Sequence, residues 1–150
     1  MPDTMICVVI HYVFSTKQRQ PWLSDGIRER VWAYMGGIAR DNRMKALCIG
    51  GVADHVHLLI SMPATVTFAQ AMQLIKGGSS KWIHETFPGM SGFAWQESYG
   101  AFAVDETSLD RVIAYIQNQA VHHRSVGFQD EFVAFLKANR MSYNEKYLWD

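Results

Sequence analysis

Four stretches of the chain are predicted to form strands from their runs of apolar and β-branched residues. They are residues 5–14, 45–49, 55–62 and 100–104. The first stretch alternates strictly and is largely apolar on both faces, because successive side chains of a strand point to opposite sides. Gly50 and Gly51 precede the third stretch, so the second and third strands are expected to form a hairpin.

Apolar residues recur at helical spacing in four other stretches, each preceded by a residue that can begin a helix. These helices are expected at about residues 25–41, 68–82, 109–120 and 128–136. Gly77 and Gly78 are expected to interrupt the second helix, because glycine weakens a helix interior. The apolar stripe of the third helix continues without a break to Ala120.

The order of elements is strand, helix, strand, strand, helix, strand, followed by two helices. This order predicts an α+β fold in which helices pack over one face of an antiparallel sheet. With 150 residues, of which 49% are hydrophobic and 19% charged, the chain suits one ordered domain spanning residues 1–150.

The charge balance gives no general attraction to nucleic acid, since 14 Lys and Arg match 14 Asp and Glu. A local basic stripe would still suffice for DNA binding. Its candidate residues are Lys17, Arg19, Lys76 and Lys81. The sequence has neither a secretory signal pattern nor an apolar run near the ~20 residues that span a bilayer, so we expect a cytoplasmic protein without a membrane partner.

Two histidines stand two residues apart on the third predicted strand. His55 and His57 therefore leave the same face of the sheet, where their rings can converge on one ion. From spacing alone, an incidental or hydrogen-bonded pair is the alternative. Asp54 precedes them and either closes the turn or orients an imidazole by accepting its proton.

A group of polar side chains lies beside the apolar stripe of the third helix. Tyr115 and Gln119 are four residues apart and so lie on one side of the helix. Arg111, Asn118 and His122 project to the same flank. This flank is either a solvated surface with a half-buried tyrosine or part of a functional site.

Several separated stretches together resemble a known family, the single-tyrosine HUH transposases of small bacterial insertion sequences (IS200-like) and their repetitive-palindrome-associated relatives. The stretches are, in order, HYVFSTKQRQPWL, IGGVADHVHLLISMP, KGGSSKWI, FAWQESYGAFAV and YIQNQAVHH. They span nearly the whole chain. The resemblance implies a ferredoxin-like (RRM-like) sheet, a homodimer, and recognition of single-stranded DNA with hairpin ends.

The resemblance also implies roles for individual residues. The HUH motif matches His55, Val56 and His57, which implies that the two imidazoles bind a divalent metal. The family's helical tyrosine matches Tyr115, and a third metal ligand, the glutamine one turn later, matches Gln119. The implied reaction cleaves and rejoins single-stranded DNA through a 5′-phosphotyrosine, which conserves the bond energy for rejoining.

Two further expectations concern the metal and the assembly. Two imidazoles and an amide oxygen leave coordination positions open and are compatible with manganese or magnesium, whereas zinc is less favoured without a cysteine cluster. The resemblance predicts that two subunits share each site. In that arrangement His55 and His57 come from one chain, and Tyr115 and Gln119 from the other.

Other functions remain open at this level. Arg111 and His122 join the DNA-binding candidates because they flank the tyrosine. The main alternative is a non-catalytic module that binds single-stranded nucleic acid by stacking bases on Trp95, Tyr99 and Phe102, although aromatic residues near a short strand more often belong to a core. A third hypothesis is that the protein is a metal-dependent hydrolase of small molecules.

Overall fold

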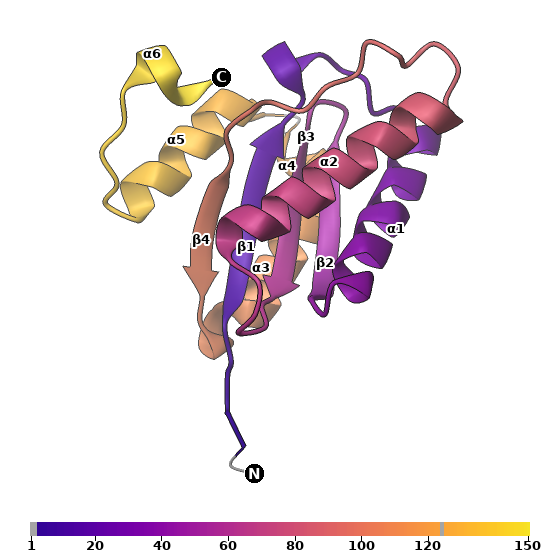
Figure 1. The fold of residues 1–150 in the computed structure, drawn as a ribbon. Coiled ribbons are helices and arrows are strands. Elements are labelled where there is room, and N and C mark those ends of the chain that lie inside the picture. The colour runs from indigo at the N-terminus through magenta and orange to yellow at the C-terminus, as the bar shows by residue number, and fades with distance from the viewer. Residues whose placement is uncertain (1–2, 124) are drawn as a thin grey trace.

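The computed structural model, which describes residues 3–123 and 125–150, is built around a four-stranded antiparallel sheet (Figure 1). Its strands are β1 (Val9–Ser15), β2 (Lys45–Val52), β3 (His55–Ser61) and β4 (Gly100–Val104). They are ordered β2-β3-β1-β4, and each neighbouring pair is antiparallel. The expected hairpin is β2-β3. This topology confirms the α+β, ferredoxin-like fold class.

Helices lie on both sides of this sheet (Figure 1). The helical segments are α1 (Asp25–Asp41), α2 (Phe68–Thr86), α3 (Leu109–Gln117), α4 (Gln119–His122), α5 (Phe128–Ala138), α6 (Glu145–Leu148) and the 3-10 turns η1 (Lys17–Arg19) and η2 (Glu106–Ser108). The pair α1 and α2 covers one face, as expected, while α3, α4 and α5 lie over the other. None of the described helices has the length and apolar character needed to cross a membrane.

The alternation along β1 divides the buried side chains between the two faces. Ile10, Tyr12 and Phe14 belong to the larger core, which α1 and α2 cover. Val13 points the other way and packs in a smaller cluster with residues of α5, including Phe132. The second cluster matters for function because it lies on the same face as the histidines of β3.

The first strand is shorter than its apolar pattern predicts. Pairing begins at Val9, which lies opposite Ser61 and Val104, the last residues of the two neighbouring strands. Residues 3–8 therefore have no neighbouring strand to bury them, and Met5 is 90% exposed. An apolar alternation extends a strand only as far as neighbouring strands can pair with it.

Two predictions about helix continuity were wrong. Gly77 and Gly78 do not interrupt α2, which runs from Phe68 to Thr86. A Cβ at position 78 would lie 2.8 Å from Ile38 Cδ1, so this glycine permits close packing of α1 on α2. The third helix is not continuous, because Asn118, with φ −100° and ψ 22°, separates α3 from α4.

Candidate active site

The two predicted metal ligands of β3 are fully buried on the face opposite the larger core. His55 and His57 point to the same side of the strand, with ring centroids 5.3 Å apart, as their spacing predicted. In the register of the sheet they lie beside Ser15 and Val13 of β1. Their rings are therefore held by a central strand and not by a mobile loop.

Each of these imidazoles has a hydrogen-bond partner at Nδ1, which leaves Nε2 directed toward the centre of the site. Asp54 Oδ1 accepts from His55 Nδ1 at 2.7 Å, so this aspartate orients an imidazole. His57 Nδ1 lies 2.8 Å from Nε2 of His11, a buried residue of β1. Sequence reasoning gave His11 no role.

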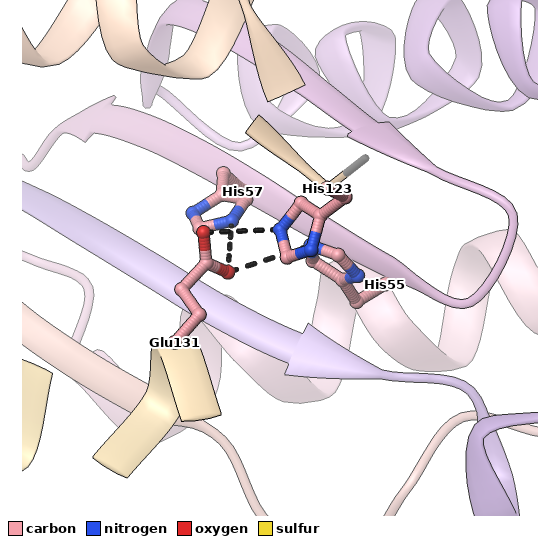
Figure 2. Close-up of side chains that lie close together, drawn as sticks. All are labelled: His55, His57, His123 and Glu131. Atoms are coloured by element: carbon pink, nitrogen blue, oxygen red, sulfur yellow. Dashed lines mark hydrogen bonds and ion pairs between the residues drawn. The ribbon is translucent and has the colours of Figure 1, made fainter. Parts of the chain in front are cut away.

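An acidic residue from α5 completes the group (Figure 2). Glu131 is only 3% exposed, and its carboxylate lies 3.0 Å from His57 Nε2, 3.4 Å from His55 Nε2 and 3.1 Å from His123 Nε2. One ligand atom from each of the four residues lies within 4.8 Å of the others. Three imidazoles and a carboxylate at this spacing could hold a divalent metal ion.

Sequence reasoning missed Glu131, although a signal for it was present. The residue lies three positions after Phe128 and four before Phe135, so it belongs to the apolar stripe of α5 and faces the sheet. A carboxylate at such a position requires a partner, because burying an unpaired charge is costly. His123 was also missed, although it follows directly after the predicted His122.

The charges in this group depend on one another. Burial opposes protonation of His55, but hydrogen bonds to Asp54 and Glu131 outweigh it and raise the pKa of His55 to about 9. Burial lowers the pKa of His57 to about 4. Burial alone would raise the pKa of Glu131. Hydrogen bonds from His123, His55 and His57 outweigh this effect and hold the pKa well below the ordinary value. Near neutral pH the metal-free group therefore pairs a His55 imidazolium with a Glu131 carboxylate.

The predicted nucleophile and the predicted amide ligand reach the same group from the helical layer. Asn118 ends α3, and the turn directs Gln119 inward, where it is 1% exposed and its Oε1 lies 3.1 Å from His55 Nε2. The Tyr115 hydroxyl donates to Glu131 and lies 3.2 Å from His122 Nε2. Burial and the Glu131 carboxylate raise the pKa of Tyr115, so its resting form is the neutral phenol.

All four residues carried over from the family pattern thus lie together within one chain. The ring centroids of Tyr115 and His57 are 5.7 Å apart. Within one chain, α3 packs directly on β2, where Ile116 lies against Gly50 and leaves Tyr115 beside the histidines. The resemblance predicts instead that two subunits share each site, and this stays a prediction about the assembly.

The six predicted DNA-binding residues fall into two groups. Arg111 is exposed and, with Tyr115 and His122, lines a cavity of about 510 Å³ between α3 and α5. Arg19 is half-buried, lies 5.8 Å from the ring of Trp149, and lines another cavity that includes His123. Lys17 is exposed on η1 beside Arg19.

The remaining two candidates lie on α2, which covers the opposite face of the sheet. Lys76 is not a free surface cation, because its Nζ donates to the carbonyls of Glu97 and Ser98 at 3.0 and 3.1 Å. Lys81 is exposed there. Two of the aromatic residues considered for base stacking, Trp95 and Phe102, are buried, which agrees with their reading as core.

Comparisons with known proteins agree with the fold and with the family resemblance. A family model described as "Transposase IS200 like" matches residues 5–119. The ISDra2 transposase TnpA of Deinococcus radiodurans is 24% identical over 114 residues, which are 73% of this chain and 81% of that protein.

Two solved structures share the fold. One, from Deinococcus radiodurans R1 and assigned as a transposase, is 23% identical with a TM-score of 0.66, and the match covers 79% of this chain and 95% of that one. The other is a REP-associated tyrosine transposase bound to a REP hairpin, which is 16% identical with a TM-score of 0.62 over 84% of this chain and 74% of that one.

Proposed function

The chain belongs to the IS200-like transposase family, and from this premise we propose that it cleaves and rejoins single-stranded DNA at hairpin ends, with Tyr115 as nucleophile. The observation that carries the proposal is the convergence of the Tyr115 hydroxyl with the buried group around His55, His57 and Glu131. A phenol beside a candidate metal centre is the combination that phosphodiester transfer by tyrosine requires.

The proposed reaction forms one bond and breaks another at the scissile phosphorus. The Tyr115 oxygen attacks the phosphorus, the bond to the 3′ oxygen breaks, and the DNA ends become a 5′-phosphotyrosine and a free 3′ hydroxyl. Glu131 accepts the hydrogen bond of this phenol and so orients its oxygen. The departing proton goes to solvent in the cavity that Tyr115 lines. The reverse attack by a 3′ hydroxyl restores the phosphodiester and frees the tyrosine.

The metal in this proposal is held by His55 and His57 together with an oxygen from Gln119 or Glu131. When bound, a divalent ion supplies positive charge that polarises a non-bridging phosphate oxygen and favours the phenolate. An imidazole-rich group with a carboxylate suits manganese better than magnesium, because magnesium prefers oxygen ligands. Manganese is therefore the expected ion, and magnesium the weaker alternative.

The residues that contact the DNA backbone are proposed to lie on the face of the sheet that carries the site. Arg111 borders the cavity beside Tyr115, and Arg19 borders the cavity beside His123. Arg28 lines the second cavity too, although it also pairs with Asp25. The hairpin bound by the REP-associated transposase supports a hairpin as the form of DNA recognised. A homodimer is proposed from the family pattern alone.

The experiment uses labelled oligonucleotides that carry a hairpin with randomised single-stranded flanks. We expect a covalent protein-DNA species on denaturing gels with Mn²⁺, none with EDTA, and none from Tyr115→Phe. Tyr147→Phe, which alters a tyrosine that is 60% exposed, is the matched control and should form the adduct normally. An equal adduct from Tyr115→Phe would refute the assignment of the nucleophile.

The same oligonucleotides test which face binds DNA. Each phosphate contact releases counterions when DNA binds. Removing one contact therefore reduces the slope of log affinity against log salt concentration by about one. We expect this change for Arg111→Ala and Arg19→Ala, and none for Lys81→Ala on the opposite face. A change confined to Lys81→Ala would contradict the proposed DNA path.

A further inference from the structure

His11 is a buried polar residue for which the proposed chemistry has no direct use. It lies on β1, is 3% exposed, and has its ring against Phe102 and Phe135, at centroid distances of 6.5 and 5.2 Å. Its one hydrogen bond among the described residues joins its Nε2 to His57 Nδ1 at 2.8 Å. A polar ring in an aromatic setting, aimed at a candidate metal ligand, requires an explanation.

We propose that His11 is a positioning residue that sets the tautomer of His57, so that His57 can offer its Nε2 lone pair to the metal. The proposal rests on the proposed function, which makes His57 a ligand. A neutral imidazole carries one proton on its two nitrogens, so Nε2 is free for a metal only when the proton is on Nδ1. His11 Nε2 is then the acceptor that holds this proton.

The metal-free protein requires the opposite arrangement. Glu131 Oε1 lies 3.0 Å from His57 Nε2, and an ionised carboxylate can only accept, so His57 carries its proton on Nε2. His57 Nδ1 must then accept, and His11 Nε2 must donate. The bond between the two rings therefore reverses direction when a metal replaces the Nε2 proton.

A histidine suits this reversal better than most side chains. Its Nε2 donates in one tautomer and accepts in the other, so the same atom serves both states without moving. Asp54 offers an instructive contrast, because its carboxylate accepts from His55 Nδ1 at 2.7 Å and cannot donate. His55 is thus held in one orientation throughout, whereas the bond to His57 is the one that can reverse.

The register of the sheet makes the contact rigid. His11 lies opposite Leu59 on the neighbouring strand, and His57 lies opposite Val13, so the two histidines are diagonal neighbours on one face. His11 also lines the cavity between α3 and α5, next to Tyr115. A side chain at this point can hold His57 and does not occupy a coordination position itself.

Two substitutions separate hydrogen bonding from packing. His11→Phe keeps a ring and removes the polar atoms, whereas His11→Gln can place an amide near the position of Nε2 and can donate or accept. His84, an exposed residue that bonds to the Phe93 carbonyl, is the control, as His84→Phe and His84→Gln. Calorimetry with Mn²⁺ should give an affinity about 10- to 100-fold weaker for His11→Phe and within about threefold of wild type for His11→Gln.

Nitrogen NMR of the wild-type protein gives a second readout that needs no variant. With Zn²⁺ as a diamagnetic probe, we expect the proton of His57 to move from Nε2 to Nδ1 on binding, while His55 keeps its Nδ1 proton. An unchanged His57 tautomer, or wild-type Mn²⁺ affinity in a folded His11→Phe protein, would overturn the proposal for His11 and leave the proposed function intact. Wild-type protein that binds no metal would instead overturn the metal site itself.

Discussion

Glu131 connects more parts of the site than any other single residue. Its carboxylate contacts two histidines of β3, His123 and the Tyr115 hydroxyl. If it is a ligand, Glu131→Gln should weaken Mn²⁺ binding on the order of tenfold or more, because the neutral amide removes the negative charge that attracts the cation. Asp130→Asn, an exposed neighbour on the same helix, should bind normally.

Calorimetry on both variants checks this prediction. Equal or tighter binding by Glu131→Gln would contradict the role of Glu131 as a ligand. In that case its carboxylate would be a structural partner of the histidines, and the oxygen ligand would be left to Gln119.

Metal binding at His55 should be coupled to proton release. The pKa of His55 is raised to about 9, so below that pH the metal-free imidazole carries a proton that a cation must displace. His57, whose pKa is lowered to about 4, releases none near neutrality. Apparent Mn²⁺ affinity should therefore rise about tenfold per pH unit between pH 6 and 8 and level off above pH 9.

This coupling is measured by titrating Mn²⁺ in buffers of different ionisation enthalpy at pH 7. The expected result is the release of about one proton per ion bound. A pH-independent affinity over this range would mean that His55 is neutral before the metal arrives.

At the scale of elements, the contact between β2 and α3 decides where the nucleophile lies. A Cβ at Gly50 would come within 2.7 Å of the Ile116 carbonyl oxygen, so Gly50→Ala must push α3 outward and move Tyr115 with it. Such overpacking costs on the order of 1–3 kcal/mol of unfolding free energy, and each kcal/mol lowers Tm by about 2–4 °C in a chain of this size.

We expect Gly50→Ala to lose adduct formation by more than about tenfold, a larger effect than its stability loss alone would cause, because in-line attack tolerates little displacement. Gly26→Ala, where a Cβ meets nothing within 4 Å, is the control and should remain active. Thermal melts and the adduct assay make the comparison. A Gly50→Ala protein as stable and as active as wild type would show that α3 is not held by this contact.

The elements show which structural features local sequence can specify. Thr67 caps α2 through a reciprocal pair of hydrogen bonds with Gln70, and such caps are readable from side-chain chemistry. Continuity through Gly78 was not readable, because it depends on the close packing of α2 against Ile38 of α1. The turn at Asn118 was not predicted either, because the apolar stripe runs past it to Ala120. The convergence of the two β3 histidines was predicted because side chains two residues apart in a strand lie on the same face. The role of Glu131 required knowing in addition that its side of α5 faces these histidines.

The whole molecule raises the question of whether one chain is sufficient for one site. Tyr115 and His57 lie together in a single chain. We therefore expect that co-expressed His57→Ala and Tyr115→Phe chains do not restore cleavage, because every site keeps one defect. Adduct formation by purified mixed oligomers is the measurement. Recovery of about a quarter of the sites would instead indicate subunits that exchange their tyrosine helices.

In the proposed reaction, the Tyr115 oxygen becomes bonded to a 5′ phosphate of DNA. Tandem mass spectrometry of the digested covalent species, formed with Mn²⁺, tests this most directly because it identifies both the residue and the polarity of the link. The expected result is a peptide that carries the nucleotide on Tyr115 through its 5′ phosphate, with a free 3′ hydroxyl on the released strand. A nucleotide on any other residue, or a link through a 3′ phosphate, would contradict the assignment of Tyr115 and the polarity of the proposed reaction.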